Sequence, residues 1–233
     1  MIEDRIAGWP SGLVRGADGS LVSVFGFGPT EAREILFPVT RERSLPLGYA
    51  PGDLAGIAPG VLIRRVVLAD LEHLLAAVPR ADQRLTIISG YRSYANQTVL
   101  FEARVRQRLA QANGDLSIEE ARERANGGTA LPGHSQHQLG TALDLSTPEL
   151  GPQIFRGFAQ TIAGQWLREH AGSYGFVFPY TEEGRERTRY IAEPWHIRWL
   201  GKELAALLVA DCYLGSSEVV VDDYLEALER LLG

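Results

Sequence analysis

Cysteine is almost absent from this chain of 233 residues, because Cys212 is the only one. A single cysteine cannot form a disulfide within the chain, and it excludes a structural zinc site built from several cysteines. Any metal that this chain binds must therefore be held by histidine and carboxylate side chains. Long apolar runs are absent as well, since no stretch approaches the roughly 20 apolar residues of a membrane-spanning helix.

An excess of basic residues is also lacking. The formal net charge is −6, so no overall positive field draws this chain to nucleic acid or anionic lipid. A basic pocket confined to one region is still compatible with that charge. We expect neither a nucleic-acid partner nor a transmembrane segment.

The amino terminus lacks the basic segment and apolar core of a secretory leader. No internal repeat or low-complexity tract is visible, and a hydrophobic content of 45% supports one well-buried domain. We expect a catalytic domain over residues 36–233. Residues 1–35 are expected to be an appendage, in which Asp18-Gly19 between alternating apolar residues predicts a hairpin.

Helix and strand patterns are interspersed along the rest of the chain. Ser117 and Glu120 have the spacing of a capping box at the start of one helix. Helices are predicted over residues 66–78, 96–112, 118–126, 154–174, 202–210 and 222–232. Strands are predicted over residues 84–89, 141–146, 175–180 and 190–199, with a solvated charged loop over residues 181–188.

The stretch Pro132–Ser146 combines a loop with a strand. Pro132-Gly133 and the polar residues after it are typical of a turn, whereas residues 141–146 alternate like a strand with one buried face. Asp144 lies between two leucines of this strand, where burying a carboxylate is costly unless it is paired, hydrogen-bonded or bound to metal. The stretch therefore offers His137 and Asp144 as candidate metal ligands.

A third candidate ligand, His196, follows later in the chain. Two imidazoles and one carboxylate suit a metal such as zinc and leave a fourth position for water. Glu193 is a candidate general base, since Pro194 permits a bend that would turn this side chain toward the metal. Taken on composition alone, two histidines and an aspartate so far apart in the sequence are more often unrelated than a metal site.

We predict that two histidines within predicted helices, His73 and His170, are not metal ligands. His73 lies within a predicted helix and has no partner at a metal-binding spacing. His170 is placed near the carboxyl end of another helix, where a positive charge is favourable.

Three motifs stand out in the sequence: Ser135-x-His137-x-x-Gly140-x-Ala142-x-Asp144, Glu193-Pro194-Trp195-His196 and Ser89-Gly90-Tyr91-Arg92-Ser93-Tyr94-x-x-Gln97. Together they resemble the motifs of the VanY-type zinc D-alanyl-D-alanine carboxypeptidases, relatives of lysostaphin-like peptidases and of the hedgehog signalling domain. The resemblance covers about residues 36 to 230. The fold that it implies is α+β, with a small antiparallel sheet that carries one zinc ion and is flanked by helices.

The resemblance also implies roles for single residues. His137, Asp144 and His196 correspond to the zinc ligands, and Glu193 to the base that activates water. Arg92 corresponds to an arginine that stabilises developing negative charge, as a guanidinium can with two directed hydrogen bonds. Candidate contacts to the peptide are Ser135, Gln97 and Tyr91. Gln136 departs from the family, because many relatives have an acidic residue there, and we expect this to affect substrate preference.

The function expected from the resemblance is removal of the terminal D-alanine from peptidoglycan stem peptides or precursors. The alternatives are an L,D-carboxypeptidase or an endopeptidase with the same zinc machinery, and, from another class, a non-catalytic wall-binding module. Presence of the ligands, the base and the arginine together favours an enzyme. The family is expected to act in the cell envelope or outside the cell, while the missing leader leaves a cytoplasmic location open. The sequence does not determine the oligomeric state.

Overall fold

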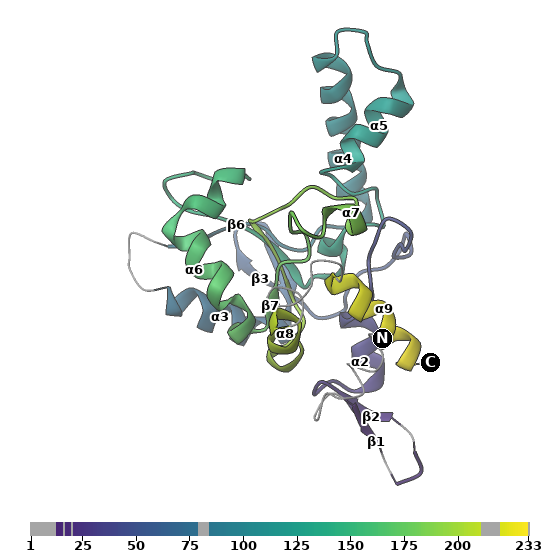
Figure 1. The fold of residues 1–233 in the computed structure, drawn as a ribbon, viewed down its shortest axis with the longest axis vertical. Coiled ribbons are helices and arrows are strands. Elements are labelled where there is room, and N and C mark those ends of the chain that lie inside the picture. The colour runs from purple at the N-terminus through teal and green to yellow at the C-terminus, as the bar shows by residue number, and fades with distance from the viewer. Residues whose placement is uncertain (1–12, 16, 20, 79–83, 211–219, 233) are drawn as a thin grey trace.

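The computed structural model describes residues 13–15, 17–19, 21–78, 84–210 and 220–232. A hairpin of two helices forms one end of the molecule, and a β-hairpin forms the other (Figure 1). The helical hairpin consists of α4 (Tyr94–Gln111) and α5 (Ile118–Asn126). The β-hairpin pairs β1 (Leu13–Arg15) with β2 (Leu21–Val24), on either side of Asp18 and Gly19.

A four-stranded antiparallel sheet lies at the centre, in the order β5-β6-β8-β7. Its strands are β5 (Thr86–Ser89), β6 (Ala142–Ser146), β7 (Phe176–Val177) and β8 (His196–Trp199). The pairing of β6 with β8 places Asp144 opposite His196. The prediction of an α+β fold with a small antiparallel sheet is therefore confirmed.

Helices and a second hairpin surround this sheet. The hairpin is formed by β3 (Leu54–Ala58) and β4 (Val61–Arg64). The α-helices are α2 (Pro29–Ile35), α3 (Leu68–Ala77), α6 (Ile162–His170), α7 (Arg185–Thr188), α8 (Lys202–Leu208) and α9 (Val221–Leu232). The 3₁₀ turns are η1 (Arg65–Val67), η3 (Gln136–Leu139), η4 (Arg156–Gln160) and η5 (Ala171–Tyr174). Among the described helices, none has the length and apolarity needed to cross a membrane.

One face of the sheet packs on the main hydrophobic core. Leu143 and Leu145 of β6 and Ile197 of β8 are fully buried in this core. Helices α3, α6 and α8 supply Leu71, Leu74, Leu167, Leu204 and Leu208 to it. Because successive residues of a strand point to opposite faces, Asp144 and His196 emerge on the other face.

That second face is buried too, so the prediction of one buried face for residues 141–146 is wrong. All five residues of β6 and all four of β8 are buried. The end of α2 and the segment after it cover the second face. Arg198 donates two hydrogen bonds to carbonyl groups there, to Ile35 at 2.9 Å and to Phe37 at 2.8 Å. These two hydrogen bonds attach the end of α2 and the segment after it to β8, and Arg198 itself is fully buried.

The single helix predicted over residues 154–174 is also wrong. It is divided into η4, α6 and η5, because Thr161 has an extended backbone and caps α6 through a hydrogen bond from the Gly164 amide. As a consequence, Phe155 and Ile162 are 51% and 62% exposed, whereas Phe158 and Leu167 are buried.

Two further boundaries differ from the prediction. The strand predicted over residues 175–180 is only two residues long, since it ends before Pro179, which has no amide hydrogen to donate. The charged segment 181–188 contains the short helix α7 and not only a solvated loop. Its last residue, Thr188, is buried and donates to the carbonyl of Gly184.

The amino-terminal segment is in contact with the body. Val24, Phe25 and Phe27 are buried and belong to the main core, and the Phe27 ring packs edge-on against Trp199 at 5.6 Å between centroids. The division of the chain at residue 35 stays a prediction, and residues 1–12 lie outside the described residues.

Candidate metal centre

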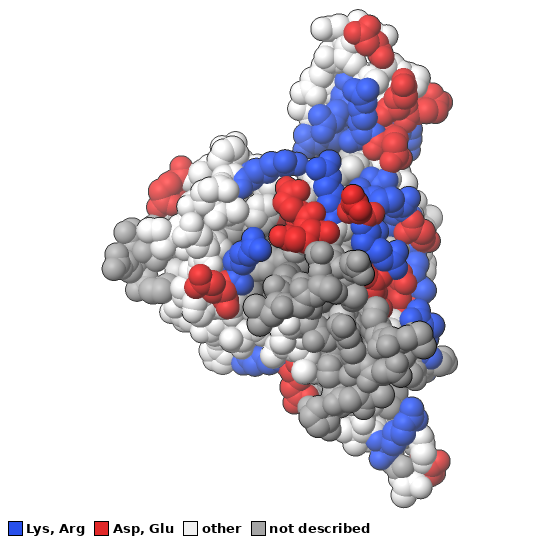
Figure 2. Space-filling view, viewed as in Figure 1, with Lys and Arg blue, Asp and Glu red and all other residues white. Residues whose placement is uncertain are grey.

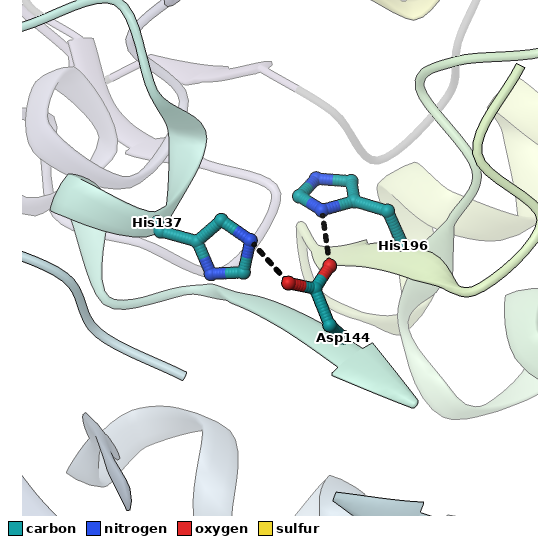
Figure 3. A group of neighbouring side chains, drawn as sticks. All are labelled: His137, Asp144 and His196. Atoms are coloured by element: carbon teal, nitrogen blue, oxygen red, sulfur yellow. Dashed lines mark hydrogen bonds and ion pairs between the residues drawn. The ribbon is translucent and has the colours of Figure 1, made fainter. Parts of the chain in front are cut away.

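His137, Asp144 and His196 converge on the polar face of the sheet (Figure 3). Each offers a ligand atom within 4.8 Å of the others, and all three side chains are buried. The Asp144 carboxylate lies between the rings, with Oδ2 at 3.1 Å from Nε2 of His137 and Oδ1 at 3.1 Å from Nδ1 of His196. Asp144 and His196 come from the neighbouring strands β6 and β8, and His137 comes from the 3₁₀ turn η3.

Gly140 shapes the connection between η3 and β6. Its φ of +71° lies in the left-handed region, and its amide donates to the His137 carbonyl. A Cβ at this position would be 3.0 Å from Cγ of Arg64, in addition to the conformational strain. Glycine thus permits the chain to leave the His137 turn and enter the strand that carries Asp144.

The nitrogen of His137 that faces away from Asp144 is held by the backbone. Nδ1 lies 2.7 Å from the carbonyl oxygen of Gly90. When Nδ1 donates to this carbonyl, Nε2 carries no hydrogen and points toward the candidate metal centre. A metal-binding histidine usually donates its other ring nitrogen to such an acceptor. Position 90 requires glycine, because a Cβ there would be only 2.3 Å from the Leu62 carbonyl oxygen.

The far nitrogen of His196 has a side-chain partner. Nε2 lies 3.2 Å from Oε1 of Gln136, so that Nδ1 is left for the centre. Gln136 is 1% exposed, and its amide nitrogen has no hydrogen-bond partner among the described residues. The position singled out in the sequence for its departure from the family therefore contacts a candidate ligand.

These residues fit zinc. Two imidazole nitrogens and one carboxylate oxygen are the donor set of open, catalytic zinc sites. Burial lowers the pKa of His196, which favours the neutral ring that a metal requires. Burial alone would raise the pKa of Asp144, but the charge and hydrogen bonds of His137 and His196 hold it below its ordinary value. The carboxylate is therefore ionised.

Glu193 lines the same cleft as the three candidate ligands. Its carbonyl accepts a hydrogen bond from the His196 amide at 3.0 Å, which closes a turn with Pro194 and Trp195 as central residues. The bend expected from Pro194 is thus present. Burial raises the pKa of Glu193 well above its ordinary value and the Asp144 carboxylate adds to the shift, while Arg92 and Arg156 oppose it.

Arg92 also points into the cleft from the loop after β5. Its guanidinium donates to Oγ of Ser89 at 2.8 Å and to Oε1 of Gln97 at 3.0 Å, and lies 3.5 Å from Oδ2 of Asp144. Its backbone amide donates to the His137 carbonyl. These contacts fix a positive charge beside the candidate metal ligands.

The predicted peptide contacts have different positions. Ser135 is buried and lines the cleft. Gln97 also lines it, but its amide group is engaged by Arg92 and by the Ala130 carbonyl, to which it donates at 2.6 Å. Tyr91 does not line the cleft, and its amide donates to the Leu62 carbonyl. The roles of these residues toward substrate stay predictions.

Sequence reasoning missed Tyr180 and Tyr190 as walls of the cleft. The Tyr180 ring lies 5.2 Å from the His196 ring and 5.0 Å from the Tyr190 ring. Burial raises the pKa of both phenols, so they are neutral at physiological pH. No spacing in the sequence links either tyrosine to the ligands, because the long-range packing of the 178–190 segment brings them there.

The sequence matches a known protein family over more than half of its length. Residues 60–202 match the VanY family, D-alanyl-D-alanine carboxypeptidase. YodJ of Bacillus subtilis is 30% identical over 208 residues, which make up 84% of this chain and 69% of YodJ.

Solved structures give the same result. The vancomycin resistance D,D-pentapeptidase VanY of a VanB-type cassette, a mutant in complex with Zn(II), is 26% identical with a TM-score of 0.67, and the match covers 82% of this chain and 99% of that one. The LD-carboxypeptidase LdcB is 27% identical with a TM-score of 0.68, covering 92% and 93%. The chain therefore belongs to the VanY family of D-alanyl-D-alanine carboxypeptidases, which are zinc metallopeptidases.

Proposed function

We propose that this protein is a D,D-carboxypeptidase that removes the terminal D-alanine from peptidoglycan stem peptides or their precursors. The observation that carries the proposal is the gathering of three candidate ligands, one carboxylate with a raised pKa and one fixed arginine around a single cleft. These are the parts that hydrolysis of a peptide bond requires.

His137, Asp144 and His196 are proposed to hold the zinc ion. Zinc, when bound, supplies a Lewis acid and activates water near neutral pH. Gly90 and Gln136 orient the two imidazoles through their far nitrogens. The neutral phenols of Tyr180 and Tyr190 form an uncharged wall beside them.

Glu193 is proposed as the general base and acid. It takes a proton from the water that attacks the scissile carbonyl, and it passes this proton to the nitrogen of the departing D-alanine when the C–N bond breaks. Its raised pKa suits both halves of this transfer, because an ordinary carboxyl group would be a weak base near neutral pH.

Arg92 is proposed to stabilise the negative charge that develops on the carbonyl oxygen. Ser89 and Gln97 hold the guanidinium in place before substrate binds, so little reorganisation is needed during the reaction.

An L,D-carboxypeptidase is the second candidate, since LdcB matches 92% of this chain about as well as VanY matches 82%. Incubation of the zinc-loaded protein with a stem pentapeptide and a stem tetrapeptide, followed by mass spectrometry, separates the two. We expect loss of one alanine from the pentapeptide. Loss of alanine from the tetrapeptide alone would refute the D,D assignment in favour of the L,D one, and release of larger fragments would indicate an endopeptidase.

A further inference from the structure

The cleft continues well beyond the metal centre. It has a volume of about 300 Å³, and it is lined by residues of α4 that recur on one face of that helix. These residues are Gln97, Leu100, Arg104 and Arg108. Ala125, Gly128 and Thr129, from the end of α5 and the segment after it, also line the cleft. We call the part lined by Arg104 and Arg108 the distal arm.

Two unpaired arginines distinguish the distal arm. No carboxylate of the described residues forms an ion pair with Arg104 or Arg108, whereas Arg122 in the same helical hairpin pairs with Glu102 at 2.7 Å. Within the described part of the chain, Arg104 donates only to the uncharged side chain of Gln107, and the buried Nε of Arg108 has no hydrogen-bond partner. Both carboxylates that line the cleft, Asp144 and Glu193, belong to the metal centre.

The distal arm is lined by basic side chains, although the whole chain is acidic. The formal net charge of the chain is −6, and basic and acidic side chains lie close together on the helical hairpin and where it joins the body (Figure 2). Two guanidinium groups that line the distal arm, and that have no ion-pair partner among the described residues, are suited to an anionic group of a ligand, which each can bind with paired hydrogen bonds.

The length of the distal arm indicates which part of the substrate it receives. With a rise of 1.5 Å per helical residue, Arg104 lies about 10 Å and Arg108 about 16 Å along α4 from Gln97, which contacts Arg92. An extended peptide advances about 3.5 Å per residue. The arm is therefore too long for a single departing alanine, and it matches a peptide that continues for about three to five residues on the acyl side of the scissile bond.

We propose that Arg104 and Arg108 form a subsite for a carboxylate on the acyl part of the substrate, about three to five residues before the scissile bond. This inference rests on the proposed function, whose substrate has the required chemistry when its acidic second residue carries a free carboxylate. The subsite selects stem peptides with that carboxylate over those in which it is a carboxamide.

Equilibrium binding to a protein that cannot turn over tests the subsite. Two stem pentapeptides are compared that differ only in a carboxylate or a carboxamide at the second residue. Their dissociation constants are measured by calorimetry with the zinc-loaded full chain in a Glu193→Gln background. The preference is then measured again after Arg104→Gln and Arg108→Gln together. Arg106→Gln is the matched control, because Arg106 is exposed on the same helix and does not line the cleft.

We expect the carboxylate peptide to bind about tenfold more tightly than the amide, equivalent to 1.4 kcal/mol. The double substitution should reduce this ratio toward one, and added salt should reduce it as well. Arg106→Gln should leave the ratio intact. Equal binding of the two peptides, or a ratio that survives the double substitution, would overturn the inference.

Turnover of the same peptides by the unsubstituted protein answers a separate question. If neither peptide loses its terminal alanine, the proposed D,D activity is wrong. The ratio of the two dissociation constants still decides whether the distal arm binds a carboxylate.

Discussion

The central sheet and the α4–α5 hairpin line the same cleft but differ in construction. Every residue of β6 and β8 is buried, and the far nitrogens of both candidate histidine ligands are held by Gly90 and Gln136. The hairpin projects from the body (Figure 1), and its own small core consists of Phe101, Val105, Ala121 and Ala125. The proposed chemistry depends on exact ligand positions and is placed on the rigid sheet, whereas the proposed recognition of a carboxylate is placed in the distal arm.

The largest effect is expected from removing the ligand between the two imidazoles. Asp144→Ala leaves two buried histidines without their shared carboxylate, and two nitrogen donors do not make a stable zinc site. We expect loss of zinc and of turnover to background, measured by metal analysis and by the pentapeptide assay. Asp115→Ala, in the exposed turn of the hairpin, is the control and should retain both. Retention of zinc by Asp144→Ala would contradict the assignment of this site.

Two substitutions of Arg92 test its charge and its hydrogen bonds separately. Arg92→Gln should lower kcat/KM by about 10²- to 10³-fold, the usual loss when a donor to a developing oxyanion is removed. It should also move the acidic limb of the pH profile. The base acts only when ionised, so activity is lost as pH falls through the pKa of Glu193.

That pKa lies above the ordinary value of 4.5, and Arg92 opposes the rise. Removing the positive charge raises the pKa of Glu193 further, which shifts the acidic limb to higher pH. Arg92→Lys keeps the charge and should keep the limb near its original position while losing the paired hydrogen bonds. A limb that does not move in Arg92→Gln would show that Glu193 is not the titrating base.

A smaller effect is expected from the side chain that orients His196. Gln136→Leu removes the acceptor for Nε2 and leaves that nitrogen buried without a partner. Zinc affinity should fall by about 10- to 100-fold, as for other outer partners of metal ligands, and competition with a chelator measures it. Gln136→Glu restores an acceptor oxygen and should recover most of the affinity. Equal affinities in all three proteins would mean that Gln136 acts only on substrate.

The smallest effect on the metal centre should come from the hairpin core. Phe101→Ala removes a fully buried ring from a core of four residues, with a cost of about 3–5 kcal/mol for such a truncation. Hydrogen exchange should become faster in α4 and α5, while the amides of β6 and β8 keep their protection and zinc stays bound. Loss of protection in the sheet would show that the two regions unfold as one unit.

Much of the metal centre could be predicted from the sequence, because its residues lie in short local patterns. The strand around Asp144, the turn before it and the bend at Pro194 depend on neighbours in the sequence, and all three are present. The capping box of Ser117 and Glu120 is formed for the same reason.

What could not be predicted depends on contacts between distant segments. Arg198 alternates with apolar residues in the sequence, yet it is buried because the end of α2 and the segment after it cover it. Thr161 divides a continuous apolar pattern, since its hydroxyl caps α6. The spacing of Gln97, Arg104 and Arg108 on one helical face was visible in the sequence, but only the structure shows that this face lines the cleft.

The most direct test of the proposed metal centre and its base is to measure zinc content and turnover on the same sample of Glu193→Gln. The proposed ligands lie on β6, β8 and η3, and the proposed base lies in the turn before β8, so this variant should retain one zinc ion per chain. Its kcat should fall by about 10²- to 10⁴-fold, the usual contribution of general acid–base catalysis. Loss of zinc together with turnover would show that Glu193 is a ligand, and full activity with zinc bound would show that another group transfers the proton.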